Sequence, residues 1–262
     1  MTALHDNRAK LRLIHDTGFD RYFRAEEWAD YNRQFFDGLA RKYDATNWLH
    51  AMGTKRVYDR LSVARLPIPP GAHLLDLCTG SGDIAIRMAR THPDARITGV
   101  DASARMLEVA TRKAGKLLDR IRFLQGDALA LDFPDDHFDG AMISFGLRNL
   151  SSLERGLAEM RRVVRPGGFV CNIETGKPRP RLFRLAYEVQ SRHVTPALGK
   201  LLFHLGEYNS FRYVPESNKY FPHQDVLVEV FKQAGFERVR LHEYWFGAVA
   251  QEIGIIPGGE PA

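Results

Sequence analysis

Apolar residues follow two different spacings along this chain, and the change between them divides it near residue 67. Between residues 27 and 62 apolar side chains recur every three or four positions, the spacing of one face of a helix. We therefore predict two or three short helices that act as core packing or as a cap over a site, after a loosely ordered leader at 1–25. The stripe consists of Trp28, Tyr31, Phe35, Leu39 and Tyr43.

From residue 67 onward, short apolar runs alternate with stretches of helical periodicity. The expected strands are 73–78, 96–101, 121–125, 138–144 and 169–173. The expected helices are 81–91, 103–118 with Ser103 as N-cap, and a third that starts at a capping box of Ser151 and Glu154. Strands that alternate with helices of this length predict a parallel sheet with helices on both faces.

This alternation stops after Pro178. Residues 180–225 contain helical stretches rich in aromatic residues, and two late strands at 236–244 and 247–252 should pair antiparallel at a sheet edge. The predicted fold is α/β, a doubly wound and mostly parallel seven-stranded sheet with an N-terminal helical cap and a helical insertion before the last strands. We expect a leader and cap at 1–66 and a sheet domain at 67–262, with the insertion at about 180–225.

Composition narrows the class of protein only a little. The 262 residues are 44% hydrophobic and 26% charged, an ordinary globular balance, and the net charge of +5 selects no partner. Cys78 and Cys171 lie in apolar runs, so we expect buried free thiols and no metal site. No apolar run approaches the roughly 20 residues that span a bilayer, which predicts a cytoplasmic protein.

The first candidate site is a glycine loop between a strand and a helix. Gly80 and Gly82 allow a sharp turn and close approach of the backbone to a ligand. Together with Ala85 and with Asp101, about 20 residues further on, they also fit the fingerprint of a nicotinamide dinucleotide site. A nicotinamide-dependent oxidoreductase is therefore an alternative.

Carboxylates at three successive strand ends favour a different cofactor. Asp76 suits the ammonium group of a bound amino acid, Asp101 suits ribose hydroxyls, and Asp127 suits an adenine amino group. Each residue alone could be a simple capping residue, but open α/β sheets bind ligands at these strand ends. S-adenosylmethionine carries positive charge on its sulfonium, so a site lined by carboxylates favours it over a pyrophosphate.

Several motifs carry a resemblance to a known family. The most specific is Ile143-Ser144-Phe145-Gly146-Leu147-Arg148-Asn149, and it is joined by the segments 43–47, 162–168, 174–178 and 208–222. From about Phe35 to Gly254 the chain resembles the ubiquinone/menaquinone biosynthesis C-methyltransferases, which are class I S-adenosylmethionine-dependent methyltransferases with a Rossmann-like sheet. It departs from the family pattern at Thr46, Lys55, Tyr58, Gly176 and Asn218.

The resemblance implies C-methylation of a prenylated quinol, either demethylmenaquinol to menaquinol or the related benzoquinol of the ubiquinone pathway. It also implies cofactor contacts at Ser81, Asp101, Asp127, Ala128 and Ser144. A methyltransferase of another small molecule, such as a polyketide or a sterol, is the alternative within the same cofactor class. The full predicted cofactor set is Asp76, Gly80, Ser81, Gly82, Asp101, Ala102, Asp127, Ala128 and Ser144.

Three residues are the catalytic candidates. Arg148 stays protonated in proteins, so we assign it to stabilising a ring oxyanion, with Asn149 orienting the ring oxygen. The alternative for Arg148 is a structural ion pair with a carboxylate at a strand end. His193, in the insertion, is the candidate base, and the alternative is a structural histidine.

The expected partner is a lipophilic quinol. The helix after Pro180 combines Arg181, Arg184 and Arg192 with apolar residues, a pattern typical of a membrane surface or of an ordinary solvated helix. Peripheral membrane contact at the inner face and a homodimer stay open. Nucleic acid is not expected, because the chain has neither a basic stripe nor an Asn-Pro-Pro-aromatic motif.

Overall fold

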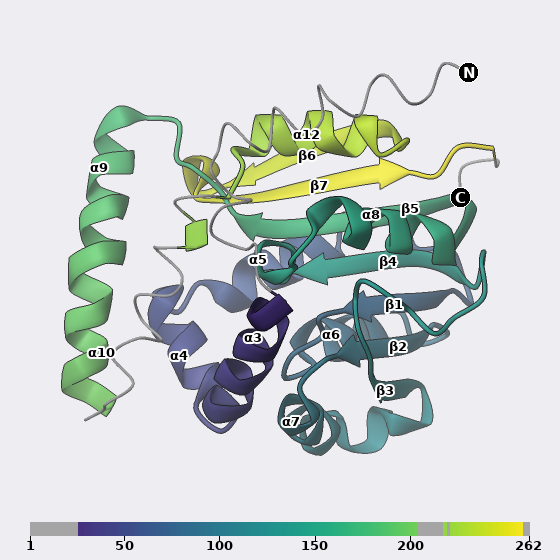
Figure 1. Cartoon of the computed structure of the whole chain (residues 1–262), viewed down its shortest axis with the longest axis horizontal. Helices are drawn as coiled ribbons and strands as arrows, with labels where there is room; N and C mark the ends of the chain where they lie inside the picture. The colour runs from purple at the N-terminus through teal and green to yellow at the C-terminus, as the bar shows by residue number, and fades with distance from the viewer. Residues whose placement is uncertain (1–25, 204–216, 219–220, 259–262) are drawn as a thin grey trace.

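The computed structural model describes residues 26–203, 217–218 and 221–258. Within them a seven-stranded sheet has the order β3-β2-β1-β4-β5-β7-β6 (Figure 1), which confirms the predicted doubly wound α/β fold. The strands are β1 His73–Leu77, β2 Arg96–Asp101, β3 Ile121–Gln125, β4 Phe138–Ser144, β5 Val164–Thr175, β6 Glu237–Tyr244 and β7 Val249–Ile255.

The first five strands run parallel, and β7 runs antiparallel to both of its neighbours, β5 and β6. The predicted antiparallel pairing of the two late strands at a sheet edge is therefore confirmed, with β6 as the edge strand and β7 between it and β5. The parallel strands point their carboxyl ends toward one side of the molecule (Figure 1). Ligand sites of such sheets form on that side.

Helices cover both faces of the sheet and its carboxyl-end side. Alternating residues of one strand reach opposite faces, so Leu75 and Leu77 pack in a cluster with α8 and α12, whereas Leu74 packs in a cluster with α5 and α6. The helices are α3 Glu26–Leu39, α4 Tyr43–His50, α5 Lys55–Val63, α6 Asp83–Thr91, α7 Ala104–Ala114, α8 Leu153–Val163, α9 Arg181–Val189, α10 Thr195–Phe203 and α12 Gln224–Gln233.

Two helix ends test the capping predictions. The Ser103 side chain accepts a hydrogen bond from the Met106 N–H at 3.1 Å, which confirms it as the N-cap of α7. The N-cap of α8 is Ser152 rather than Ser151, because Ser152 has extended backbone angles and accepts from the Arg155 N–H at 3.2 Å. Helix α7 ends at Ala114, earlier than predicted, where Gly115 takes a positive φ of 53°.

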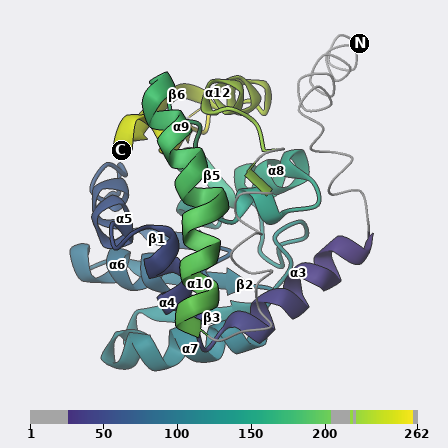
Figure 2. The same ribbon diagram turned by 90° about the vertical axis from the view of Figure 1, so that its left-hand side faces the viewer.

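Two groups of helices stand at the carboxyl ends of the parallel strands. Helices α3, α4 and α5 precede β1 and lie beside this end of the sheet (Figure 1). Helices α9 and α10, joined by the π-helical turn Gln190–Val194, form one long rod that crosses in front of the strand ends (Figure 2). The site between them is therefore bounded by the sheet, by the helices before it and by the rod.

The structure also bears on the expectations for the cysteines, for membrane-spanning helices and for the two ends of the resemblance. Both cysteines are free thiols, Cys171 buried and Cys78 partly buried. Of the helices in the described part, none has the length and apolar content needed to cross a membrane. The leader at 1–25, and most of the segment 208–222 that contributed to the resemblance, lie outside the described residues.

Candidate active site

Two adjoining cavities open at the carboxyl ends of β1, β2 and β4. The small cavity lies over the ends of β1, β2 and β3, and the large cavity, of about 750 Å³, extends from β1 and β4 to α4, α5 and α9. The residues that line both cavities, and so form the passage between them, are Phe36, Tyr43, Cys78, Ser144 and Phe145.

Asp101 is the most firmly held carboxylate of the small cavity. Its Oδ2 accepts from the Gly80 N–H at 2.8 Å and its Oδ1 from the Ser103 N–H at 2.9 Å. Burial raises the pKa of Asp101, and the two backbone donors oppose that shift. Each carboxylate oxygen can accept more than one hydrogen bond, so this fixed group keeps acceptor capacity for a ligand's hydroxyls.

The two loop glycines are required for different reasons. Gly80 has a φ of +55°, a left-handed conformation that residues with a side chain rarely adopt. Gly82 has a φ of +79°, and a Cβ there would lie 2.9 Å from the Cβ of Ala110. Gly82 therefore lets the loop pack against α7, and it lines neither cavity.

Asp76 lines the large cavity from the end of β1. Its Oδ2 accepts from the Thr79 hydroxyl at 2.5 Å and from the Ala85 N–H at 3.0 Å, so it caps the start of α6. Its Oδ1 is buried and has no hydrogen-bond partner among the described residues. Burial raises the pKa of Asp76 to about 7. A buried acceptor without a donor is costly, and a ligand cation or N–H group would satisfy it.

The other predicted cofactor residues gather around the small cavity. Asp127 accepts from the Leu129 N–H at 2.8 Å and stands at the rim, beside Ala102 and Ala128. Ser144, at the end of β4, faces both cavities. The structure therefore brings Gly80, Asp101, Ala102, Asp127, Ala128 and Ser144 to one cavity, and leaves Asp76 and Ser81 on the side of the other.

Ser81 belongs to a polar network that joins the glycine loop to α4, α5 and α7. Its hydroxyl donates to Asp44 at 2.7 Å and accepts from Lys113 at 3.0 Å. Lys113 also contacts Asp83 at 2.7 Å, and Asp83 lies 3.2 Å from Lys55. Sequence reasoning missed this network because its members are far apart in the chain and meet only after folding.

Arg148 is 6% exposed and lines the large cavity. Its guanidinium forms an ion pair with Glu174, at the end of β5, and lies 5.8 Å from the centre of the Phe145 ring. Burial raises the pKa of Glu174, and the charge of Arg148 opposes that shift. The structural ion pair considered as an alternative for Arg148 is thus present, while its position leaves it facing the cavity.

The other two catalytic candidates, Asn149 and His193, do not line the large cavity with Arg148. The Asn149 side chain donates to the Phe145 carbonyl at 3.2 Å and lines the small cavity rather than the large one. His193 is exposed and lines neither cavity, because the π-helical turn directs it to solvent. The structure therefore does not bring His193 to either cavity, and its role as the base stays a prediction.

Sequence reasoning also missed much of the large cavity's wall. Lys177 and Tyr187 line it, and burial lowers the pKa of Lys177 and raises that of Tyr187 to about 12. The aromatic weight of residues 27–62 was the only signal for the part that α4 and α5 contribute. The five departures from the family pattern all line this cavity and none lines the small one: Thr46, Lys55, Tyr58, Gly176 and Asn218.

Among the residues that the structure describes, no group of three or more His, Cys, Asp or Glu side chains is arranged to hold a metal ion. The charged groups near the passage include the carboxylates of Asp76 and Asp101, the pair of Arg148 with Glu174, and the ammonium group of Lys55. This arrangement can hold a cationic ligand at the strand ends and an oxyanion beside the guanidinium.

Comparison with known proteins shows which family this chain belongs to. The model of the ubiE/COQ5 methyltransferase family matches residues 26–256. The chain is 37% identical over 230 residues to the ubiquinone/menaquinone biosynthesis C-methyltransferase UbiE of Stutzerimonas stutzeri, covering 86% of this chain and 88% of the relative. It is 37% identical over 222 residues to the demethylmenaquinone methyltransferase of Thermus thermophilus, covering 85% of this chain and 100% of the relative.

Solved structures share the fold at lower identity. A SAM-dependent methyltransferase from Aquifex aeolicus aligns with a TM-score of 0.58 and 18% identity, over 84% of this chain and 98% of the other. The phosphoethanolamine N-methyltransferase 2 of Haemonchus contortus, solved with S-adenosyl-L-methionine, aligns with a TM-score of 0.61 and 16% identity, over 86% of this chain and 60% of the other. At such identities the likeness concerns the fold.

Proposed function

The chain belongs to the ubiE/COQ5 methyltransferase family, and from that premise we propose that it methylates a ring carbon of a prenylated quinol bound in the large cavity. It is an S-adenosylmethionine-dependent C-methyltransferase of quinone biosynthesis, and the nicotinamide alternative is set aside. One observation carries the assignment of the two cavities: buried strand-end carboxylates meet a large, aromatic cavity that contains a guanidinium.

The residues present fit S-adenosylmethionine. In this proposal Asp101 accepts from the ribose hydroxyls, and Asp127 accepts from the adenine amino group at the rim of the small cavity. The fit is tested by Asp76, whose buried Oδ1 has no donor among the described residues and which lines the large cavity next to the passage. The ammonium group of the methionine portion supplies both the missing donor and an opposite charge.

When bound, S-adenosylmethionine supplies an electrophilic methyl group on a positively charged sulfur. A ring carbon of the acceptor is nucleophilic when the neighbouring hydroxyl has lost its proton to solvent. Once that carbon carries the methyl group, its hydrogen leaves as a proton and the ring oxygen takes one up, so the ring is aromatic again and one proton is released in total. Arg148 stays protonated and lines the large cavity beside Glu174, so in this proposal its guanidinium holds that oxyanion. Glu174 in turn fixes the guanidinium in the wall, and holding the ring in place lowers the barrier further.

The proposed acceptor is demethylmenaquinol or the related benzoquinol of the ubiquinone pathway. The names of the two relatives, a ubiquinone/menaquinone biosynthesis C-methyltransferase and a demethylmenaquinone methyltransferase, support these head groups, and the aromatic wall of the large cavity supports a flat ring. A different small molecule within the same cofactor class is the competing acceptor. All five departures from the family pattern line the large cavity, where the acceptor would bind. This is the reason to test the competing acceptor.

Helix α9 supports a peripheral contact with a membrane, where a prenylated acceptor resides. Its inward side, with Arg184 and Tyr187, lines the large cavity. Its apolar side faces outward, where Leu182 and Leu185 are 82% and 60% exposed. An ordinary surface helix turns its apolar side inward and its polar side to solvent, and α9 does the reverse. An apolar outer face with Arg181 beside it suits an anionic lipid surface. Flotation with anionic vesicles tests the contact, and sedimentation tests whether a second copy covers this face instead.

Methyl transfer from labelled S-adenosylmethionine tests the function. The acceptors are a demethylated naphthoquinol, a demethylated benzoquinol and a phenolic polyketide, each analysed by NMR for the position of the new methyl group. We expect label on a ring carbon of one of the quinols and no transfer to the polyketide. Transfer only to the polyketide, or transfer to oxygen, would overturn the proposal.

A further inference from the structure

The turn between β6 and β7 holds its backbone in an uncommon conformation. Trp245, Phe246 and Gly247 all have positive φ values, of 48°, 56° and 93°. Only glycine adopts this region freely, and two consecutive bulky residues there cost free energy that the surrounding structure must offset. The turn is thus built to aim two aromatic rings in defined directions.

Hydrogen bonds from three neighbouring segments maintain this conformation. The Arg179 N–H donates to the Phe246 carbonyl at 3.0 Å, and the Ala248 N–H donates to the Trp245 carbonyl at 3.1 Å. Below the turn, Gln224 donates to Glu243 at 2.7 Å, and the Arg179 guanidinium contacts the same carboxylate at 2.8 Å. The turn is therefore a rigid frame rather than a loose loop.

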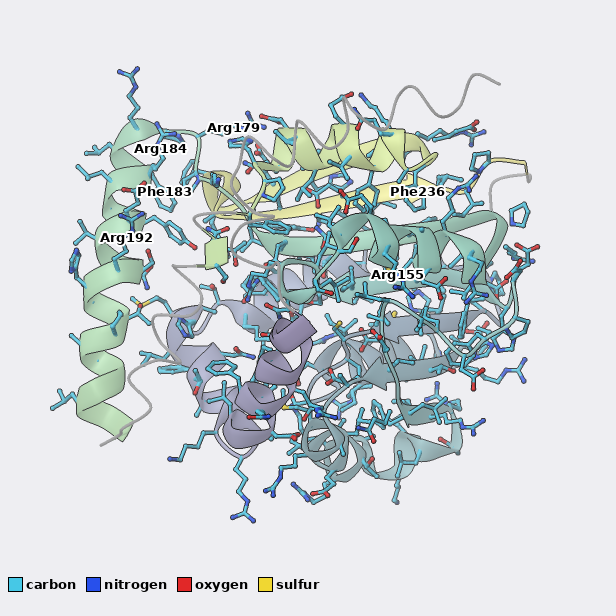
Figure 3. The ribbon with its side chains drawn as sticks, in the orientation of Figure 1. Arg155, Arg179, Phe183, Arg184, Arg192 and Phe236 are labelled. Carbon is cyan, nitrogen blue, oxygen red and sulfur yellow. The ribbon has the colours of Figure 1, made fainter. Side chains whose placement is uncertain are left out.

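The two rings form an aromatic rim at the mouth of the large cavity. Trp245 lines the cavity and is 43% exposed, while Phe246 is 67% exposed. Phe246 contacts Phe183 with ring centres 5.1 Å apart, and Phe183 lines the cavity from α9. Figure 3 shows Phe183 and Arg179 at the end of the long rod where it meets this turn.

Apolar side chains also lie outside the cavity on the same helix. Leu182 and Leu185 are exposed on the outward side of α9, whereas Phe183 lines the cavity. The large cavity, of about 750 Å³, accommodates a ring and a few prenyl units but not a long chain, so a polyprenyl tail must leave through its mouth. Aromatic rings left exposed at that mouth gain stability when such a tail covers them.

We propose that Trp245, Phe246 and Phe183 grip the first prenyl units of the acceptor where its tail leaves the large cavity, so that the rim selects for tailed acceptors. This inference rests on the proposed function. The occupant is the tail of the bound substrate, because the rim is continuous with the cavity that receives the ring. Recognition is by apolar contact, because the side chains of the rim are aromatic rings and a prenyl tail is a hydrocarbon.

The experiment compares a polyprenylated demethylquinol with its tail-free counterpart, both in the same detergent. The variants are Trp245→Asn and Phe246→Asn, because asparagine tolerates a positive φ. The control is Trp48→Gln, which removes another exposed ring, 63% accessible, that lines neither cavity. We expect each rim variant to lower the ratio of kcat/KM for tailed over tail-free acceptor about tenfold, the scale of a lost aromatic contact, and the control to leave the ratio unchanged.

Two results would overturn the proposed role of the aromatic rim. If the ratio stays constant while both activities fall, the turn has only a structural role, and if neither activity changes, the tail leaves elsewhere. Circular dichroism and the dissociation constant for S-adenosylhomocysteine establish that each variant is folded. A wild-type protein that methylates neither quinol overturns the proposed function as well, which separates that failure from the failure of the rim alone.

Discussion

The small cavity is formed mostly by consecutive strand ends and the loops that follow them, with one wall from α3 and the start of α4, whereas the large cavity is assembled from segments far apart in the chain. In the small cavity, backbone N–H groups of Gly80 and Ser103 fix the central carboxylate of Asp101. In the large cavity the wall consists of side chains from α4, α5, α9 and the β6–β7 turn. A hydrogen bond from a backbone N–H group remains when the side chain of that residue is replaced. A cavity wall made of side chains changes with each replacement.

The five positions at which the chain departs from the motifs of the family lie on one side of this division. All five departures from the family pattern line the large cavity, and none lines the small one. The comparison implies that cofactor binding and acceptor choice are separable in this protein. A change on one side should leave the other side intact. Three predictions test that and a fourth concerns a carboxylate outside both cavities, and they run from the largest expected effect to the smallest.

The largest effect is expected for Arg148→Lys, in the large cavity. Lysine keeps the charge but loses the planar fork that contacts Glu174 and the ring oxygen together. Loss of an oxyanion donor typically costs about 2.7–4 kcal/mol, so single-turnover methyl transfer should slow at least about a hundredfold. Titration with S-adenosylhomocysteine should give a nearly unchanged dissociation constant. Near-wild-type turnover would show that Arg148 only supports the wall.

Asp101→Ala should have the opposite pattern, in the small cavity. Removing a charge-assisted acceptor should weaken S-adenosylhomocysteine binding by roughly 1.5–3 kcal/mol, measured by calorimetric titration. Asp101→Asn is the matched variant, because it keeps the shape while losing the charge. Thermal unfolding controls for the N–H groups of Gly80 and Ser103 that lose their acceptor. An unchanged dissociation constant for both variants contradicts the assignment of the small cavity.

The third prediction concerns pH and Asp76. Burial raises the pKa of this carboxyl to about 7, and only its ionised form attracts the ammonium group of the cofactor. Protonation at low pH therefore competes with binding, and affinity for S-adenosylmethionine should improve about tenfold between pH 6 and pH 8. Asp76→Asn should flatten this dependence. A flat profile in the wild-type protein removes Asp76 from the ammonium site.

The smallest effect is expected at Glu252, a carboxylate that belongs to neither cavity. It is buried in β7, accepts from Asn172 at 2.7 Å, and burial raises its pKa to about 8. The folded state then holds a proton that the unfolded chain has already lost, so stability falls as pH rises above the unfolded value. Between pH 6 and 7 the wild type should lose about 1.4 kcal/mol of unfolding free energy relative to Glu252→Gln.

Urea unfolding of both proteins at the two pH values measures this difference. A parallel pH dependence of the two proteins contradicts it. Methyl transfer by Glu252→Gln should match the wild type, because the residue lines neither cavity. A loss of transfer without a loss of stability would instead connect this carboxyl to the large cavity.

The sequence predicted the strands and the strand-end carboxylates because both depend on local patterns. Apolar runs and glycine loops placed Asp76 and Asp101 correctly at the ends of β1 and β2. The direction of a side chain after a short turn is not set by spacing, so Asn149 and Arg148 separated. For the same reason the sequence did not indicate that His193 is exposed.

Contacts that form only in the folded chain escaped prediction altogether. The network of Lys55, Asp83 and Lys113 links helices before and after β1, and no local pattern marks it. The aromatic rim depends on the backbone conformation of Trp245 and Phe246, which alternation of apolar residues cannot indicate. The sequence therefore predicts the small cavity, which backbone groups hold in place, better than the large cavity, which selects the acceptor.

A crystal structure with S-adenosylhomocysteine tests the division into two cavities most directly. The account predicts the adenosine in the small cavity, with both ribose hydroxyls within hydrogen-bonding distance of Asp101. It also predicts the amino group beside Asp76 and the sulfur facing the passage toward Arg148. Adenosine bound in the large cavity, or ribose hydroxyls away from Asp101, would contradict it.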